Sequence, residues 1–377
     1  MNSVVIPTRN AGERFRETLE AIQAQVDSTA ELVVVDSGSS DGTPELARRF
    51  GARTICISPE SFNHGETRNL GIQEASGELC VLLVQDAVPA QQTWLANLIA
   101  PFSDPRVVGV TGRQVPRPDA DPIGRWEVEW GNRFLGEKLV VQEVVNCDDF
   151  LALDYEQRLR IAWFNNVCSA VRREFWERHP FRSVPFAEDV DWSLRALAAG
   201  YRIVYNPFAS VIHSHSRPAA YNLRRHYVAA KIMRKLLQAP SADRVAGSDI
   251  EFFSQVGDLC AEVESMLARP AGDSDEEFAV FCGPARGTWR SVLAASGLRR
   301  LQPNYEGNPL REHFYSLLDE LRIEEACSEP GVRNHILIQA LARSIGISTA
   351  SYHNWCEANG CLSAEMQRLE ATWSAGV

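Results

Sequence analysis

The sequence predicts an α/β fold with a mostly parallel central sheet, followed by a mainly helical C-terminal region. Strand and helix signals alternate through the first third of the chain, which is typical of parallel sheets. Two strand signals, residues 32–35 and 79–85, are rich in Val and Leu, like strands buried on both faces. Each run stops at an acid, Asp36 or Asp86. Ligands of open α/β sheets bind beyond the carboxyl ends of strands, so these acids indicate a site for a nucleotide and a cation.

The expected elements follow one another in a regular order. They are strands at residues 4–6, 32–35, 53–58, 79–84 and 107–111, with helices at 13–25, 43–50, 66–75 and 91–100 between them. This alternation predicts right-handed crossovers. The pattern loosens over residues 116–162. Order returns with a strand at 166–171, a helix at 188–199 and short strands near Ile203 and Val211.

The character of the chain changes after about Pro218. Residues 221–238 form a predicted helix with five basic side chains, and the rest is mostly helical. We place a boundary near Pro240, which gives domains at 1–239 and 240–377. The basic helix either docks the tail against the first domain or lies on an anionic membrane. Residues 340–352 are locally similar to a helix-turn-helix, but the acidic surroundings and the spread of apolar residues favour a plain packed helix pair.

Composition excludes several classes of protein. A formal net charge of −11 over 377 residues argues against a general nucleic-acid binder. Nine scattered cysteines without a C-x-x-C pair predict reduced thiols rather than disulfides or a zinc site. No run reaches the length of a transmembrane helix, and a strand begins at once after the N-terminus. We therefore expect a cytoplasmic protein whose membrane contact, if any, is peripheral.

The segments after the two acidic strand ends each have two interpretations. Asp36 begins a run of small residues and could accept a hydrogen bond from a pyrimidine N–H or a ribose hydroxyl, or it could simply form a tight turn. In the same run we expect Asp41 and Thr43 to be structural. Asp86 could bind Mg²⁺ or Mn²⁺ on a diphosphate. Its alternative is an ordinary solvated acid before a turn.

Three further clusters are candidates for chemistry. Glu188, Asp189 and Asp191 open a helix, where acids usually complement the helix dipole. Three acids in four residues exceed that need, so one could be a general base. Residues 213–215 read His-Ser-His, and strand alternation puts both histidines on one side, where one near Asp86 could complete a metal site. Residues 64–69 begin a helix whose N-terminus, with Arg68, suits an anion or a base edge, and a plain N-terminal cap is the alternative.

Taken together and in this order, these motifs resemble family 2 glycosyltransferases with the GT-A fold. The matching segments are residues 5–10, 35–43, 67–71, 85–89 and 188–189. Within that family, residues 62–65, 85–87 and 213–215 are most similar to bacterial rhamnosyltransferases. The resemblance covers roughly residues 1–217 and leaves out the C-terminal third.

The resemblance implies roles for individual residues. Those expected to hold the donor nucleotide are Pro7, Thr8, Arg9, Asp36, Ser37, Arg68, Gln85 and Asp86. Asp86 matches the last acid of the family's D-x-D motif and would bind the cation, while Val84 stands at the first-acid position. His213 is the expected further metal ligand, with His215 second. Asp189 of the Glu188–Asp189 pair would be the catalytic base.

The implied reaction is transfer of a sugar with inversion. A carboxylate takes the proton of an acceptor hydroxyl, and Mg²⁺ or Mn²⁺ stabilises the departing diphosphate. The expected donor is dTDP-L-rhamnose, and the expected acceptor is a growing surface polysaccharide or a lipid-linked glycan. UDP- or GDP-linked sugars are alternative donors. A sugar-nucleotide nucleotidyltransferase is a further alternative, although residues 7–12 lack the Gly-rich basic loop which that class needs.

Overall fold

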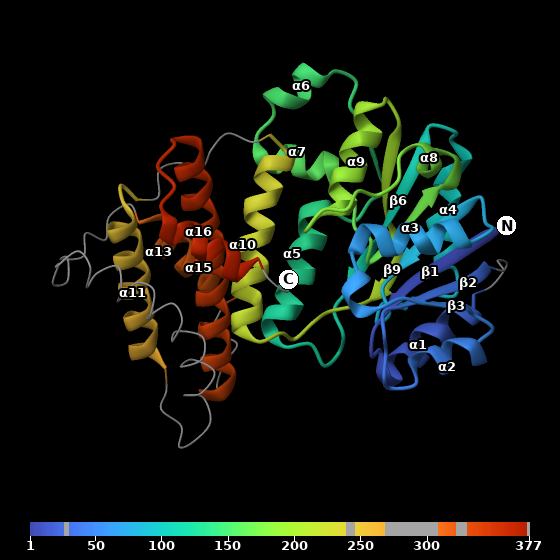
Figure 1. Ribbon diagram of the computed structural model, residues 1–377, viewed down its shortest axis with the longest axis horizontal. Helices are drawn as coiled ribbons and strands as arrows, with labels where there is room; N and C mark the ends of the chain where they lie inside the picture. Colours follow the sequence, from blue (N-terminus) through green and yellow to red (C-terminus); the bar gives the residue numbers. More distant parts are fainter. Residues whose placement is uncertain (26–29, 239–245, 268–307, 322–329, 375–377) are drawn as a thin grey trace. The chain divides into compact units, whose positions relative to one another are not determined.

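The computed structural model describes residues 1–25, 30–238, 246–267, 308–321 and 330–374 (Figure 1). Contacts divide the chain into two compact units. The N-terminal unit comprises Met1–Ala120 and Glu127–His215, and the C-terminal unit comprises Asp121–Trp126 and Ser216–Val377. The expected boundary near Pro240 lies outside the described residues. The units divide earlier in sequence because the basic helix packs against the C-terminal helices rather than ending the first domain.

The N-terminal unit is built on one mixed sheet. The described strands are β1 (Asn2–Thr8), β2 (Ala30–Asp36), β3 (Arg53–Cys56), β4 (Leu79–Leu83), β5 (Val88–Pro89), β6 (Val107–Val115), β7 (Val140–Gln142), β8 (Cys168–Arg172) and β9 (Arg202–Ile212). Their order is β3-β2-β1-β4-β8-β6-β9-β5, and β7 also pairs with β9. The strands β3, β2, β1 and β4 run parallel, whereas β8 runs antiparallel between β4 and β6.

Helices cover both faces of this sheet (Figure 1). The helices of the first 215 residues are α1 (Gly12–Gln23), α2 (Thr43–Arg49), α3 (His64–Glu74), α4 (Trp94–Ile99), α5 (Pro122–Leu135), α6 (Cys147–Ala152), α7 (Tyr155–Ala162), α8 (Arg173–Arg178) and α9 (Glu188–Ala198), with 3₁₀ turns η1 (Pro59–Ser61) and η2 (Ala100–Ser103). Side chains from α1, α2 and α4 pack on one face. Side chains from α3, α8 and α9 pack on the other.

Strand alternation explains why the central strands are apolar throughout. In β1, Val4 and Ile6 pack under α1, whereas Val5 faces the opposite cluster, and all three are fully buried. In β2, Val34 and Val33 divide between the faces in the same way. A strand covered on both sides needs apolar residues at every position. Polar residues lie instead at the ends of these strands, where the candidate site is found.

Two stretches differ from their predicted form. The short strands expected near Ile203 and Val211 are one strand, β9, whose pairing with β6 shifts register between Gly112 and Arg113. Such an irregularity breaks the alternation that identifies a strand. The region 116–162 contains α5, β7, α6 and α7. Its elements are short or amphipathic, and no long apolar run in the sequence predicts them.

The C-terminal unit is helical. Its described helices are α10 (Ala219–Leu236), α11 (Asp249–Met266), α13 (Pro309–Glu320), α15 (Pro330–Ala358) and α16 (Ala364–Trp373). The helix-turn-helix interpretation of 340–352 is wrong, because α15 runs unbroken through this segment. Gly346 does not make a turn. A Cβ there would lie 2.4 Å from the carbonyl oxygen of Leu223, so the glycine lets α10 and α15 approach closely.

Two further expectations concern the cysteines and the absence of a membrane-spanning helix. Each cysteine among them is a free thiol, as expected. None of the helices that the structure describes is long and apolar enough to cross a membrane.

Candidate active site

Sheet register brings the polar strand ends together. Thr8 at the end of β1 pairs with Asp36 at the end of β2. Beyond β4, the amide of Val84 donates to the carbonyl of Val167 (3.2 Å), which leads into the neighbouring strand β8. Because β1 also runs parallel to β4, with Val5 paired to Leu82, the turn that carries Asp86 lies at the same edge of the sheet as Asp36, beyond the carboxyl ends of the strands. The prediction that the two acids share one edge is confirmed by this register.

Asp36 is buried and organises the loop after β2. Its Oδ1 accepts from the amides of Gly38 (3.2 Å) and Ser39 (2.9 Å), and its Oδ2 accepts from the hydroxyls of Thr8 (2.9 Å) and Ser39 (2.5 Å). These contacts form the tight turn that was one of its two interpretations. Gly38 has a φ of +82°, a conformation that glycine adopts without cost. Asp36 shapes the loop whether or not it also meets a nucleoside.

The remaining small polar residues of this region also hold backbone segments. Ser37 donates through its hydroxyl to the carbonyl of Thr8 (2.9 Å). Asp41 accepts from the amide (3.1 Å) and hydroxyl (2.6 Å) of Thr43 and from the amide of Gly12 (3.0 Å). The expectation that Asp41 and Thr43 are structural is confirmed by these bonds.

Gln85 ties the turn after β4 to the loop after β1. Its Oε1 accepts from the amide of Arg9 (2.8 Å), and its Nε2 donates to the Arg9 carbonyl (3.3 Å). Pro7 is half-buried at the end of β1, while Arg9 is exposed beyond it. The pair of bonds fixes the backbone that presents the Arg9 side chain.

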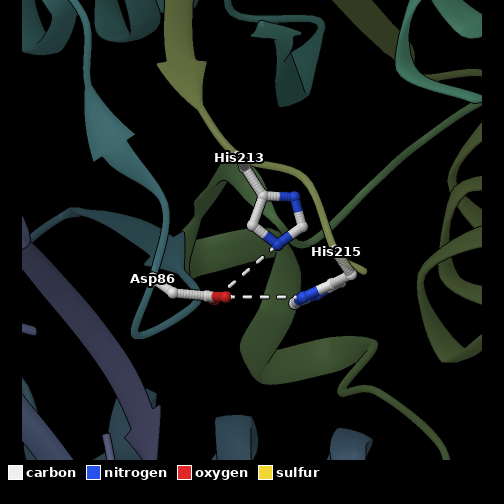
Figure 2. Close-up of side chains that lie close together, drawn as sticks. All are labelled: Asp86, His213 and His215. Carbon is white, nitrogen blue, oxygen red and sulfur yellow. Dashed lines mark ion pairs between the residues drawn. The ribbon is translucent and has the colours of Figure 1, made fainter. Parts of the chain in front are cut away.

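Three candidate metal ligands converge next to this turn (Figure 2). Asp86 Oδ1 lies 3.7 Å from His213 Nε2, and Asp86 Oδ2 lies 3.6 Å from His215 Nδ1. The two imidazole rings meet edge to face, with centroids 4.5 Å apart. Donors bound to one cation at about 2.1 Å lie no more than about 4.2 Å apart. The two Asp86 distances meet this limit, and the three donors all lie within 4.8 Å of one another, so small side-chain shifts would let them share one divalent cation. The expected grouping of both histidines with Asp86 is present.

Strand pairing and one arginine hold the two arms of this cluster together. The short strand β5, which follows Asp86, pairs Val88 with Ile212 at the end of β9. Arg117 donates from Nη2 to the carbonyl of Asp86 (2.5 Å), and its amide donates to the hydroxyl of Ser214 (3.1 Å). This arginine is nearly buried, with 7% of its surface exposed. It therefore connects the aspartate turn to the histidine segment.

Glu188, at the start of α9, belongs to a second, buried cluster of polar side chains. Arg68 Nη1 donates to Glu188 Oε1 (3.0 Å) and to the carbonyl of His64 (2.9 Å). Asn166 Nδ2 donates to the same Glu188 oxygen (3.2 Å). The arginine and the glutamate are buried. In this structure the guanidinium of Arg68 is a counter-ion for Glu188, and its expected contact with the nucleoside stays a prediction.

Asp189 occupies a different environment from Glu188. Its Oδ2 accepts from the amide of Asn166 (3.2 Å), and its Oδ1 accepts from the amide of Val190 (2.9 Å). Burial, reinforced by the neighbouring charge of Glu188, raises the pKa of Asp189 to about 7. A carboxylate with a pKa near neutrality is suited to accept and release a proton at physiological pH. Asp191 instead pairs with Arg182 and Arg195 and is structural.

Sequence reasoning missed Asn166 and Arg117, although each contacts candidate site residues. Asn166 is 1% exposed, and its side chain also accepts from the hydroxyl of Ser169 (2.9 Å). The sequence predicts Asn166 only as the first residue of a strand at 166–171, whereas β8 begins at Cys168. Two polar residues in a row at 165–166 before an apolar strand were the available signal.

Comparison with known proteins supports the family resemblance that the sequence motifs indicate. The family described as glycosyl transferase family 2 matches residues 3–154. The O-antigen chain rhamnosyltransferase WbaN of Salmonella anatum is 31% identical over 230 residues, which are 60% of this chain and 70% of that protein. The rhamnosyltransferase RfbN of Salmonella typhimurium has the same identity and coverage. A mannosyltransferase from Pyrobaculum calidifontis, solved with GDP-Man and Mn²⁺, aligns with a TM-score of 0.48 at 19% identity over 92% of this chain and 86% of its own.

These matches define the class of protein as a glycosyltransferase. The chain belongs to glycosyltransferase family 2, with its sheet in the GT-A fold, and is similar to the O-antigen rhamnosyltransferases. Membership of this family overturns the nucleotidyltransferase alternative.

Proposed function

We propose that this glycosyltransferase transfers L-rhamnose from dTDP-L-rhamnose, with inversion, to a hydroxyl of a growing surface polysaccharide or lipid-linked glycan. The observation that carries the reaction type is the environment of Asp189, a half-buried carboxylate whose pKa is raised to about 7. The choice of rhamnose rests on the likeness to WbaN and RfbN, which are named as O-antigen chain rhamnosyltransferases.

The roles proposed for the chain's own residues follow from proton and charge balance. An acceptor hydroxyl is a weak nucleophile, so Asp189 takes its proton as the new bond to the sugar anomeric carbon forms. The bond from that carbon to the diphosphate oxygen breaks, and the nucleoside diphosphate departs. A single displacement by one base inverts the anomeric centre, so a β-linked donor gives an α-rhamnoside. Glu188 assists by keeping the proton affinity of Asp189 high.

Asp86, His213 and His215 are the proposed cation ligands. When bound, a divalent cation neutralises the charge that develops on the diphosphate. Carboxylate ligands suit Mg²⁺ and Mn²⁺, whereas imidazole suits the transition metals better. A set of one carboxylate and two imidazoles therefore favours Mn²⁺ over Mg²⁺.

The donor side of the site is proposed to lie along the loops after β1 and β2. Pro7, Thr8, Arg9 and Ser37 would line it, with Asp36 and Gln85 fixing the backbone as described above. A cytoplasmic location, with peripheral contact to a membrane that holds a lipid-linked acceptor, completes the proposal.

Slow hydrolysis of nucleotide sugars tests the proposal directly. The protein would be incubated with dTDP-L-rhamnose, UDP-linked and GDP-linked sugars, each with Mn²⁺, with Mg²⁺ and with a chelator. We expect release of dTDP to be fastest and to need the cation. Asp86→Ala should lose the cation dependence together with most of the activity. Preferential release of UDP or GDP would contradict the proposed donor, and full activity in the chelator would contradict the cation site.

A further inference from the structure

The ring of His213 is held from the side opposite to Asp86. Its Nδ1 lies 2.8 Å from Oε1 of Gln114, a residue to which neither the motifs nor the comparisons assign a role. His213 itself is 6% exposed. The histidine thus has one ring nitrogen on an amide oxygen and the other turned toward the aspartate (Figure 2).

Strand pairing explains why these two residues meet. Gln114 on β6 is the register partner of Val211 on β9, and the amide of His213 donates to the carbonyl of Val115 (2.8 Å). Since side chains two apart on a strand share a face, His213 lies diagonally next to Gln114. Asn132 donates from its side chain to the Gln114 carbonyl (2.9 Å) and holds that part of β6.

The hydrogen bond determines which ring nitrogen carries the proton. An amide oxygen only accepts, so the proton of a neutral imidazole must be on Nδ1. Nε2 then keeps its lone pair, which a metal requires. The reverse tautomer would place the lone pair of Nδ1 against the Gln114 oxygen, and the 3.7 Å from Nε2 to Asp86 is longer than a hydrogen bond. Both contacts favour the same tautomer.

We propose that Gln114 is a positioning residue that holds His213 in its Nδ1–H tautomer and so presents Nε2 to a divalent cation shared with Asp86. This inference rests on the proposed cation site. Hydrogen bonds from metal-binding histidines to such partners fix the ring and raise ligand basicity, and their loss typically lowers metal affinity by about 10- to 100-fold.

The test measures Mn²⁺ binding rather than activity. Free Mn²⁺ would be followed by electron paramagnetic resonance in titrations of the full-length chain, with dTDP present. Gln114→Leu keeps the approximate volume but cannot accept the Nδ1 proton, and Gln114→Glu can still accept it. Gln91→Leu is the matched control, because Gln91 donates to the hydroxyl of Ser210 on the same strand β9. Melting temperatures would verify that each variant is folded.

We expect Gln114→Leu to bind Mn²⁺ about 10- to 100-fold more weakly, with Gln114→Glu and the Gln91 control close to the wild type. A dTDP titration without metal should give equal affinities for all four proteins. If Gln114→Leu bound Mn²⁺ as tightly as the wild type, the inference would be overturned while the proposed function stood. If the wild type itself took up no Mn²⁺, the cation site would be overturned, and the inference with it.

Discussion

Arg68 and Glu188 form a buried ion pair, with Nη1 3.0 Å from Oε1 and side chains only 5% and 8% exposed. They are 120 positions apart, and Arg68 is the fifth residue of α3 whereas Glu188 is the first residue of α9. The pair connects the acidic motif at the start of α9 to helix α3. It also places the carboxylate of Glu188 beside Asp189, whose pKa that charge raises, so the pair affects both the stability and the chemistry of the site.

Loss of the arginine should destabilise the fold strongly. Arg68→Met leaves Glu188 buried without its counter-ion, which typically costs about 3–5 kcal/mol in the free energy of unfolding. Urea denaturation would measure this loss in the free energy of unfolding. The control is Arg48→Met, which breaks an exposed pair with Glu45 and should cost less than about 1 kcal/mol. A variant of Arg68 that kept its stability and lost only dTDP affinity would show instead that this arginine is a nucleoside ligand.

The pH dependence of the reaction should report the raised pKa of Asp189. The base acts when deprotonated, so kcat/KM should rise with pH and level off above about 7. Below that, the rate should fall roughly tenfold per pH unit. Folded Asp189 also binds its proton more tightly than the unfolded chain does, so its contribution to stability declines as pH rises from the ordinary value toward 7. A flat profile between pH 5 and 8 would argue against Asp189 as the base.

Replacing the neighbouring acid should move this profile. Glu188→Gln removes a negative charge that raises the pKa of Asp189 and leaves the lowering charge of Arg68 in place. The acidic limb of the kcat/KM profile should therefore shift to lower pH, with the plateau largely retained. Complete loss of activity at every pH in a folded Glu188→Gln protein would mean that Glu188 itself takes part in proton transfer.

Asp189→Asn should remove proton transfer and spare donor binding. The amide keeps the shape of the side chain but cannot accept the hydroxyl proton, so turnover should fall by about 10²- to 10⁴-fold. The affinity for dTDP, measured calorimetrically, should stay within a few-fold of the wild type. Asp191→Asn, two residues further along α9, breaks only the bridges to Arg182 and Arg195 and serves as the control. An active Asp189→Asn protein would refute the assignment.

A pair of glycines tests the packing of the C-terminal unit. Gly346→Ala would put Cβ 2.4 Å from the Leu223 carbonyl oxygen and should cost about 1–3 kcal/mol, seen as a lower melting temperature. Gly331→Ala in the same helix meets nothing within 4 Å, so its melting temperature should be unchanged or slightly higher. Equal effects of the two substitutions would contradict the close approach of α10 and α15.

The sheet edge and its acids could be predicted because they depend on local pattern. Apolar runs locate the strands, and Asp36 and Asp86 mark where the runs end. The buried partners could not be predicted in the same way. Nothing near Arg68 in the sequence indicates that its guanidinium faces Glu188, since such a contact depends on how α3 and α9 pack.

Gly346 shows a second reason why prediction from local sequence fails. An isolated glycine within a helical pattern is compatible with a continuous helix, yet residues 340–352 also resemble a helix-turn-helix locally. Here the missing side chain serves a neighbouring helix instead of a change of direction. Local sequence does not distinguish these two uses of glycine, because the second depends on α10, more than a hundred residues earlier.

Gln85 and Asp86 are adjacent, yet one holds the loop at Arg9 and the other is a proposed cation ligand. A single peptide unit thus separates the side chain that holds the loop from the proposed cation ligand, and we expect a movement of the loop to reach the aspartate. Binding of the nucleotide and of the cation should then be thermodynamically linked, each raising the affinity for the other by the same factor. A donor that arrives at low cation concentration would recruit its own metal, and Gln85→Ala should weaken that cooperativity.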